Sequence, residues 1–339
     1  MCLPHTTLIK LMHNIQKEAP PLRQDPQGTA KHISSCLQLA VLLEISACKP
    51  GNVNRTTGFH STQYEHFLAS AVAVEPHFAH AAGQGILVSE GKTEPSEIGI
   101  GAIVKRAVES MNAWQHGGNT LLGTIILLSP MAAAAGITLA DEKELLLSEL
   151  RANVKSVMES TTPADAVAMY EAINLANPNG LIGKAPTLDV NDPKSKERIV
   201  KERITLYDIL RISATYDSIS RELVENYPLT FDVAYPYFTT QLERTGSLDT
   251  AIVHTYLKIL STNPDTLIAR KVGLSKAREV SERAREVLEF GGLDTDVGSN
   301  AVDALDESLR KQGNQLNPGT TADIIASVLA VSILNGYRP

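Results

Sequence analysis

Apolar residues recur three and four positions apart along most of the chain, which is the spacing of one face of an α-helix. This pattern predicts helices over residues 31–47, 64–88, 98–114, 121–135, 142–160, 164–175 and 274–290. Alternation typical of β-strands lasts no more than a few residues, and no Asn-Gly turn separates two alternating runs. We therefore predict an all-α fold.

Two stretches interrupt the helical pattern. Residues 1–30 are rich in proline towards their end, and we interpret them as an N-terminal arm. Residues 177–200 form the longest stretch of Pro, Gly, Asn and Lys, and loops of this length tend to be functional lids or mobile linkers. We predict one compact multi-helix domain over residues 31–339, in which this loop separates N- and C-terminal halves that pack together.

Residues 121–140 are apolar over about the length that crosses a bilayer. Pro130, two glycines and several hydroxyl residues interrupt this stretch, and no cluster of Lys or Arg flanks it. We predict a core helix that is buried on all sides.

The chain is acidic, with 31 Lys and Arg residues against 38 Asp and Glu residues and a formal net charge of −7. Such a chain is poorly suited to nucleic acid or to anionic lipid, although a few local cations suffice for an anionic small molecule. The three cysteines form no CxxC pair, which is typical of free thiols in a reducing compartment. We expect a cytoplasmic protein that acts without nucleic acid or membrane; a homo-oligomer remains an open alternative.

The loop after the first predicted helix gathers polar groups that core packing does not explain. Lys49 and Arg55 are cationic donors suited to phosphate, and the amides of Asn52 and Asn54 suit a sugar or a base. His60 is a candidate for proton transfer near neutral pH. The alternative is a polar loop whose asparagines satisfy turns.

Two further segments place glycine and hydroxyl residues before a helix. They read GGNTLLG over residues 117–123 and NPGTTAD over residues 317–323. A helix N-terminus offers free backbone amides and the positive end of the helix dipole to an anion. The alternative is an ordinary helix cap at each place. The candidates here are Gly118, Asn119, Thr120, Asn317, Gly319 and Thr320.

Three acidic residues are candidates for chemistry. Asp323 follows Thr320 by three positions, where it either completes a capping box or binds Mg²⁺. Asp265 precedes a short helix with Arg270, either as a surface ion-pair group or as part of a metal site. Glu75 lies in an apolar helix and must find a partner or become neutral, which makes it a second candidate for proton transfer.

Five segments in this order resemble the triphosphoribosyl-dephospho-CoA synthase family. They are KPGNVN with GFH, FLASAVAVEPHF, GGNTLLG, DTLIARK and NPGTTADIIA, and the resemblance runs from about residue 31 to near the C-terminus. The resemblance implies an all-helical fold and a reaction of ATP with dephospho-CoA. In that reaction the 2′-hydroxyl of dephospho-CoA displaces adenine at ribose C1′ of ATP.

The chain departs from the family pattern in several of these segments. The usual KPGLVD reads KPGNVN, so Asn54 replaces an acid, and GVNTHKG reads GGNTLLG, with Leu121 and Leu122 in place of His and Lys. These changes indicate a divergent branch. Two alternatives therefore remain, transfer to another acceptor such as a pterin, and a non-catalytic helical protein that binds nucleotide.

We predict a transferase that uses ATP and Mg²⁺, with dephospho-CoA as the expected acceptor. The predicted catalytic residues are His60 and Glu75, and the predicted metal ligands are Asp265 and Asp323. The predicted substrate-binding residues are Lys49, Gly51, Asn52, Asn54, Arg55, Gly118, Asn119, Thr120, Arg270, Asn317, Gly319 and Thr320.

Overall fold

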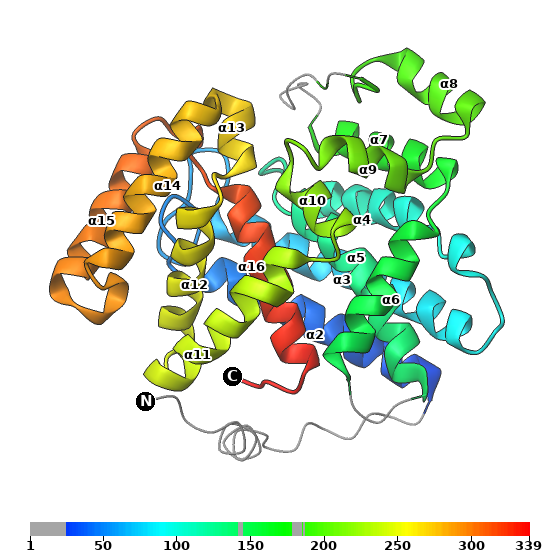
Figure 1. Ribbon diagram of the computed structural model, residues 1–339, viewed down its shortest axis with the longest axis horizontal. Helices are drawn as coiled ribbons and strands as arrows, with labels where there is room; N and C mark the ends of the chain where they lie inside the picture. Colours follow the sequence, from blue (N-terminus) through cyan, green and yellow to red (C-terminus); the bar gives the residue numbers. More distant parts are fainter. Residues whose placement is uncertain (1–24, 142–144, 178–184, 186) are drawn as a thin grey trace.

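The computed structural model describes residues 25–141, 145–177, 185 and 187–339. All regular structure within these ranges is helical, and no β-strand occurs in them. The all-α prediction is confirmed. Figure 1 shows the helices arranged in two groups that meet along the C-terminal helix.

The helices of the first half follow one another in chain order, and a long loop, residues 47–63, joins the first two of them. They are α2 (Pro26–Ser46), α3 (Tyr64–Ser89), α4 (Ile100–Trp114), α5 (Leu122–Asp141), α6 (Leu147–Glu159) and α7 (Pro163–Ala176), with a 3-10 turn, η1 (Pro95–Glu97), before α4.

The second half contains more and shorter helices. They are α8 (Pro193–Glu202), α9 (Leu206–Ser213), α10 (Ser218–Val224), α11 (Tyr235–Thr245), α12 (Leu248–Thr262), α13 (Thr266–Val272), α14 (Leu274–Glu289), α15 (Asp296–Arg310) and α16 (Gly319–Leu334). A π-helical turn, η2 (Leu229–Ala234), precedes α11, and a 3-10 turn, η3 (Gly292–Asp294), precedes α15.

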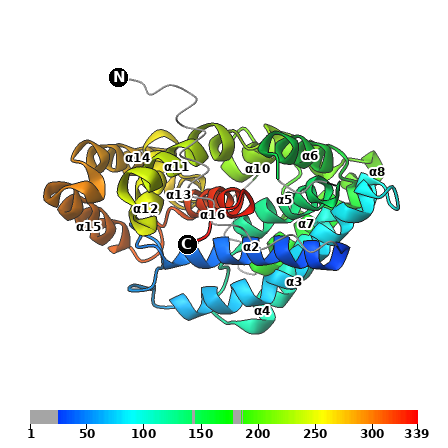
Figure 2. The same ribbon diagram turned by 90° about the horizontal axis from the view of Figure 1, so that it is seen from below.

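The C-terminal helix α16 joins the two halves. It packs against α2 and α5 of the first half and against α12 of the second. Almost every residue of α16 is buried, because the helix carries no charged side chain after Asp323 and is covered from several sides. In Figure 1 it runs in red through the middle of the molecule, and Figure 2 shows it beside α2. The prediction that the halves pack together is confirmed.

Helix α5 is the buried core helix that the sequence predicts. It is long and apolar enough to cross a membrane, yet 78% of its apolar window is buried by neighbouring helices. Small residues allow α3 and α5 to approach closely, since a Cβ atom on Gly85 or Gly136 would overlap a backbone carbonyl of the other helix. The α3–α5 contact is thereby a backbone contact at these points.

The structure corrects the limits of two irregular stretches. Helix α2 begins at Pro26, within the predicted arm, because Asp25 accepts a hydrogen bond from the Gly28 amide (2.7 Å) and Pro26 suits the first helical position. The rest of the predicted arm, residues 1–24, lies outside the described residues. The predicted loop 177–200 is shorter than expected, since α8 starts at Pro193; residues 178–184 and 186 lie outside the described part.

Candidate functional site

A cavity of about 520 Å³ lies where the two halves meet. The N-terminal ends of α5 and α16 form one side of it, and α2, α3, α7, α9, α10 and α13 contribute to the rest. Its volume is within the range of small-molecule sites. Half of the predicted site residues line it: Asn52, Asn119, Thr120, Arg270, Asn317, Gly319, Thr320 and Asp323.

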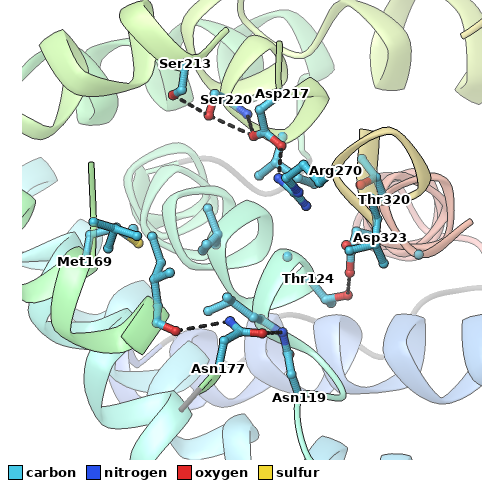
Figure 3. Close-up of a pocket in the computed structure, with 18 of the residues that line it drawn as sticks. Asn119, Thr124, Met169, Asn177, Ser213, Asp217, Ser220, Arg270, Thr320 and Asp323 are labelled. Carbon is cyan, nitrogen blue, oxygen red and sulfur yellow. Dashed lines mark hydrogen bonds and ion pairs between the residues drawn. The ribbon is translucent and has the colours of Figure 1, made fainter. Parts of the chain in front are cut away.

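Asp323 reaches from the first turn of α16 toward α5. Its Oδ1 accepts a hydrogen bond from the Thr124 hydroxyl (2.7 Å), and the missing side chain of Gly123 leaves room for the carboxylate. Burial raises the pKa of Asp323 to about 8; repulsion from Glu44 and Asp265 adds to this, while the bond from Thr124 opposes it. A carboxyl group that is protonated at neutral pH therefore faces the cavity (Figure 3).

The capping-box alternative for Asp323 is wrong. Helix α16 begins at Gly319, two residues earlier than that interpretation requires, and it has no side-chain cap. Thr320 lies inside the helix, where its hydroxyl accepts a hydrogen bond from Thr266 (3.2 Å). The Asp323 carboxylate is consequently held by another helix, α5, and not by the start of its own.

Arg270 is held at the cavity by Asp217, the N-cap residue of α10. Its guanidinium lies 2.6 Å from Asp217 Oδ1, and Asp217 Oδ2 accepts hydrogen bonds from the amide and the hydroxyl of Ser220. The Ser213 hydroxyl donates to Ser220 (2.8 Å) and extends this network to α9 (Figure 3). The two charged side chains are thus fixed relative to each other before any ligand arrives.

The cavity has a negative electrostatic balance. Within the described part of the chain, Arg270 is the one Lys or Arg residue that lines it. The acidic lining residues are Glu44, Asp189 and Asp217, together with Asp323, which adds a negative charge only when it loses its proton. An anionic ligand would therefore need additional positive charge, from a helix N-terminus or from a bound cation.

Lys49 is not the exposed phosphate ligand that the sequence predicts. Its side chain is fully buried, and its ammonium forms an ion pair with Glu44 (3.0 Å). Lys49 does not line the cavity, but Glu44 does. Burial raises the pKa of Glu44, and the charge of Lys49 opposes this shift. The pair is a buried unit in which Lys49 holds a carboxylate at the cavity wall.

Asp265 does not fit a metal ligand. Its Oδ1 accepts hydrogen bonds from the amides of Leu267 and Ile268, and its Oδ2 accepts from the amide and hydroxyl of Thr321. These four bonds cap α13 and join it to α16, and Asp265 itself does not line the cavity. Burial raises the pKa of Asp265. In the described ranges no three His, Cys, Asp or Glu residues are grouped so as to hold a metal ion.

Several predicted residues of the first loop have structural roles outside the cavity. The Gly51 amide donates to Asp306 (2.7 Å) in a left-handed turn, with φ 77°, that glycine favours. Asn54 Oδ1 accepts hydrogen bonds from the amides of Thr56 and Thr57, so the alternative of a turn-forming asparagine is the one observed.

The two residues predicted for charge and proton transfer in this loop face solvent. Arg55 is exposed and lies 3.2 Å from Asp249, and His60 is exposed as well. Neither lines the cavity, because the loop turns its backbone toward α15 and directs these side chains outward. Of the loop residues predicted, Asn52 alone reaches the cavity wall, where its amide donates to the Tyr256 hydroxyl (2.6 Å).

Glu75 and Gly118 also lie away from the cavity lining. The buried carboxylate of Glu75 is paired, as expected: the Lys31 ammonium lies 2.7 Å from it, and the Ser34 hydroxyl donates a hydrogen bond to it. The carbonyl of Gly118 accepts from the Gln115 side chain (2.9 Å). The structure therefore gives Glu75 a role in joining α2 to α3 and Gly118 a role within its own loop, and it places neither in the cavity lining.

The predicted helix-start residues behave in two ways. Asn119 caps α5, since its Oδ1 accepts from the Leu122 amide (3.1 Å), while its Nδ2 donates to Asn177 (3.3 Å). Asn317 lines the cavity with a side-chain oxygen that is buried and has no hydrogen-bond partner. Such an oxygen is an acceptor that a ligand can satisfy.

Sequence reasoning missed part of the site. Glu44 lies in an apolar helix, where the signal that identified Glu75, an acid within an apolar run, applies equally. Asp217 gave the signal of an N-cap and nothing more. The apolar lining from α7 and α9 had no signal, because its helices have the same pattern as core helices.

Several known proteins are similar to this chain in sequence. A family model described as ATP:dephospho-CoA triphosphoribosyl transferase matches residues 30–339. The 2-(5''-triphosphoribosyl)-3'-dephosphocoenzyme-A synthase of Klebsiella pneumoniae is 33% identical over 93 residues, and this match spans 27% of the chain and 30% of that protein's length. A Malonomonas rubra protein named a probable 2-(5''-triphosphoribosyl)-3'-dephosphocoenzyme-A synthase is 25% identical over 309 residues. The match covers 89% of this chain and 87% of that protein.

A solved structure shows the same fold. The crystal structure of a proposed triphosphoribosyl-dephospho-CoA synthase from Archaeoglobus fulgidus superposes with a TM-score of 0.57 at 24% identity. The superposition covers 80% of this chain and 100% of that one.

Proposed function

The chain belongs to the ATP:dephospho-CoA triphosphoribosyl transferase family, and on that premise we propose that it transfers the triphosphoribosyl group of ATP to dephospho-CoA. The 2′-hydroxyl oxygen of dephospho-CoA forms a bond to C1′ of the ATP ribose. The bond from C1′ to adenine breaks, adenine takes up a proton and leaves, and the triphosphate stays on the transferred sugar.

One observation carries the proposal beyond the family match. Each of the five sequence segments that resemble the family contributes a side chain to the same cavity: Asn52, Phe67, Asn119, Arg270 and Asp323. These segments are far apart in the chain and are brought together by the packing of α16 between the halves. A cavity built from all five is the natural place for the transfer.

The residues of the cavity suit the parts of this reaction. Arg270 supplies positive charge for the triphosphate, and Asp217 orients its guanidinium. Glu44 and its partner Lys49 supply a buried carboxylate with a raised pKa, which suits removal of the proton from the attacking hydroxyl. Glu44 therefore replaces His60 and Glu75 as the candidate for proton transfer.

We propose that Mg²⁺ accompanies the triphosphate. Mg²⁺ is usually held by one or two carboxylates together with substrate phosphates, and Asp323 fits this role because its carboxylate faces the cavity and its protein donors come from one residue, Thr124. When bound, the ion would neutralise part of the triphosphate charge, which the negative balance of the cavity makes necessary. Asp265 does not fit, since four donors already occupy its oxygens.

The two alternative functions have less support. Transfer to another acceptor, such as a pterin, and nucleotide binding without catalysis were suggested by departures from the family motifs. Two of those departures, Leu121 and Leu122, do line the cavity, but no relative in the comparisons points to either alternative. The net charge of −7 and the free cysteines support the further proposal that the protein works in the cytoplasm without nucleic acid or membrane.

Release of free adenine tests the proposed function. Purified protein is incubated with ATP, Mg²⁺ and dephospho-CoA, and adenine is separated by chromatography. We expect adenine and triphosphoribosyl-dephospho-CoA in equal amounts, and no adenine when dephospho-CoA is omitted. Asp323→Asn is the matched variant and should release adenine more slowly. Adenine formed only with another acceptor, or nucleotide binding without turnover, would contradict the proposal.

A further inference from the structure

The cavity has two ends with different chemistry. Arg270, Thr320 and Asp323 lie at one end, and Met169 lies at the other (Figure 3). Around Met169 the lining is mainly aliphatic and comes from α7, α9 and residues 187–190. We call this surface the apolar wall; its residues are Met169, Ile173, Leu188, Leu206, Ile209 and Leu210.

The apolar wall offers aliphatic contact area, and the polar groups beside it are already hydrogen-bonded: Asp189, which also lines the cavity, accepts from the amides of Ala185 and Asn191. The Tyr170 hydroxyl, which also lines the cavity here, donates to the Leu188 carbonyl (2.5 Å), and the Asn174 side chain donates to the Val190 carbonyl (3.3 Å). These two bonds hold the segment 187–190 against α7. Leu188 adopts a left-handed backbone conformation with φ 50°, which is rare for a residue other than glycine and is stabilised here by its neighbours.

We infer that the apolar wall binds the pantetheine arm of the acceptor, an inference that rests on the proposed function. ATP and dephospho-CoA share an adenosine unit, so they differ in what extends from it. ATP carries a triphosphate, whereas dephospho-CoA carries a diphosphate followed by an uncharged arm with a dimethyl-substituted carbon and several methylene groups. An aliphatic surface stabilises such an arm by removing its apolar area from water.

The positions of the charges support this orientation. The lining cation of the described part, Arg270, lies at the opposite end of the cavity, so a triphosphate is attracted away from the wall. Adenine is a poorer occupant of the wall, because its ring nitrogens and amino group would lose hydrogen bonds to water. The wall therefore distinguishes the acceptor from the donor by polarity.

The test uses shortened side chains on the wall. Ile173→Ala and Ile209→Ala remove half-buried apolar surface on α7 and α9. Leu175→Ala is the matched control, since Leu175 lies on α7 but is exposed outside the cavity. Equilibrium affinities for dephospho-CoA, ADP and ATP are measured by calorimetry without turnover. ADP has the adenosine and two phosphates of dephospho-CoA but lacks the arm.

We expect each wall variant to weaken dephospho-CoA binding by about five- to tenfold, as for loss of three half-buried carbon atoms, and to leave ADP and ATP binding unchanged. Leu175→Ala should change none of the three affinities. Equal losses for dephospho-CoA and ADP, or a loss confined to ATP, would overturn the inference. Thermal melting of each variant verifies that it is folded.

The outcome can be separated from that of the proposed function. If wild-type protein releases adenine with dephospho-CoA but binds ADP as tightly as dephospho-CoA, the inference is overturned and the proposed function stands. If no adenine is released, yet dephospho-CoA binds more tightly than ADP and Ile209→Ala removes the difference, the wall is supported and the proposed function fails.

Discussion

Asp323→Asn should make the protein less sensitive to rising pH. Most ion-paired carboxylates stabilise the folded state more as pH rises, whereas Asp323 should stabilise it less. The Asp323 pKa is about 8 in the folded protein against an ordinary value of 3.8. Between these values the folded state keeps a proton that the unfolded state has lost. The free energy of unfolding of the wild-type protein must therefore fall as pH rises through this window.

The size of the effect follows from the pKa. Each pH unit within the window costs 1.36 kcal/mol, so the wild-type protein should lose roughly 2.5 kcal/mol from this group between about pH 6 and pH 8. Asparagine is neutral at both pH values, so the variant loses no free energy of unfolding from this position over the same range. Relative to the wild type, Asp323→Asn should become more stable by roughly 2.5 kcal/mol as pH is raised over this range.

Urea unfolding followed by circular dichroism at the two pH values, without Mg²⁺ or ATP, measures this difference. Asp303→Asn is the control, because Asp303 is exposed on α15 and the same change there should leave the pH dependence as it is. Identical pH dependence in the wild type and Asp323→Asn would refute the argument that burial keeps this carboxyl protonated.

The same variant should behave oppositely in catalysis. A metal ion binds the ionised carboxylate, so binding of Mg²⁺ with ATP at pH 7 should release a proton from the wild-type protein. Asp323→Asn should release less and should need more Mg²⁺ for half-maximal activity, since a neutral amide is a weaker ligand. An unchanged Mg²⁺ requirement would remove Asp323 from the proposed metal site.

Three other variants test the contacts around the cavity, and Arg55→Ala is the exposed control for the first of them. Lys49→Ala should lower the free energy of unfolding by about 3–5 kcal/mol in urea, because it leaves a buried carboxylate unpaired, whereas Arg55→Ala, at an exposed pair, should change it by less than about 1 kcal/mol. Arg270→Ala should raise the Kd for ATP at least about tenfold, as expected for a charged hydrogen bond, with little change in Tm; an unchanged Kd would exclude it as a phosphate ligand. Gly123→Ala places a methyl group against the Asp323 carboxylate and should lower kcat while the circular dichroism spectrum stays that of the wild type.

Local features of the chain decided most of the helices. The three- and four-residue apolar spacing identifies α3 and α14 to within one or two residues, because this period depends only on the geometry of a single helix. The start of α2 also has a local signal, Asp25 followed by Pro26, although these residues were interpreted as part of the N-terminal arm. Proline before a helix and proline in a loop look alike until the cap is seen.

The segments that meet at the site were evident from the sequence, but the roles of their residues were not. Polar composition and family resemblance identified all five segments, each of which reaches the cavity. Which side chain points inward depends on what packs against the loop. Lys49 turns toward Glu44 and becomes buried, while Arg55 and His60 turn to solvent, and no local pattern distinguishes these outcomes.

The sequence by itself determined the helical class, the identity of the motif segments and the acidic character of the chain. The tertiary structure alone decided the electrostatics and shape of the cavity. The pKa of Asp323 depends on burial by other helices and on the charge of Glu44. Glu44 lies near the beginning of the chain and Asp323 near its end, so only the fold brings them together. The apolar wall is likewise indistinguishable from core in sequence, since an isoleucine that faces a cavity and one that faces another helix obey the same periodicity.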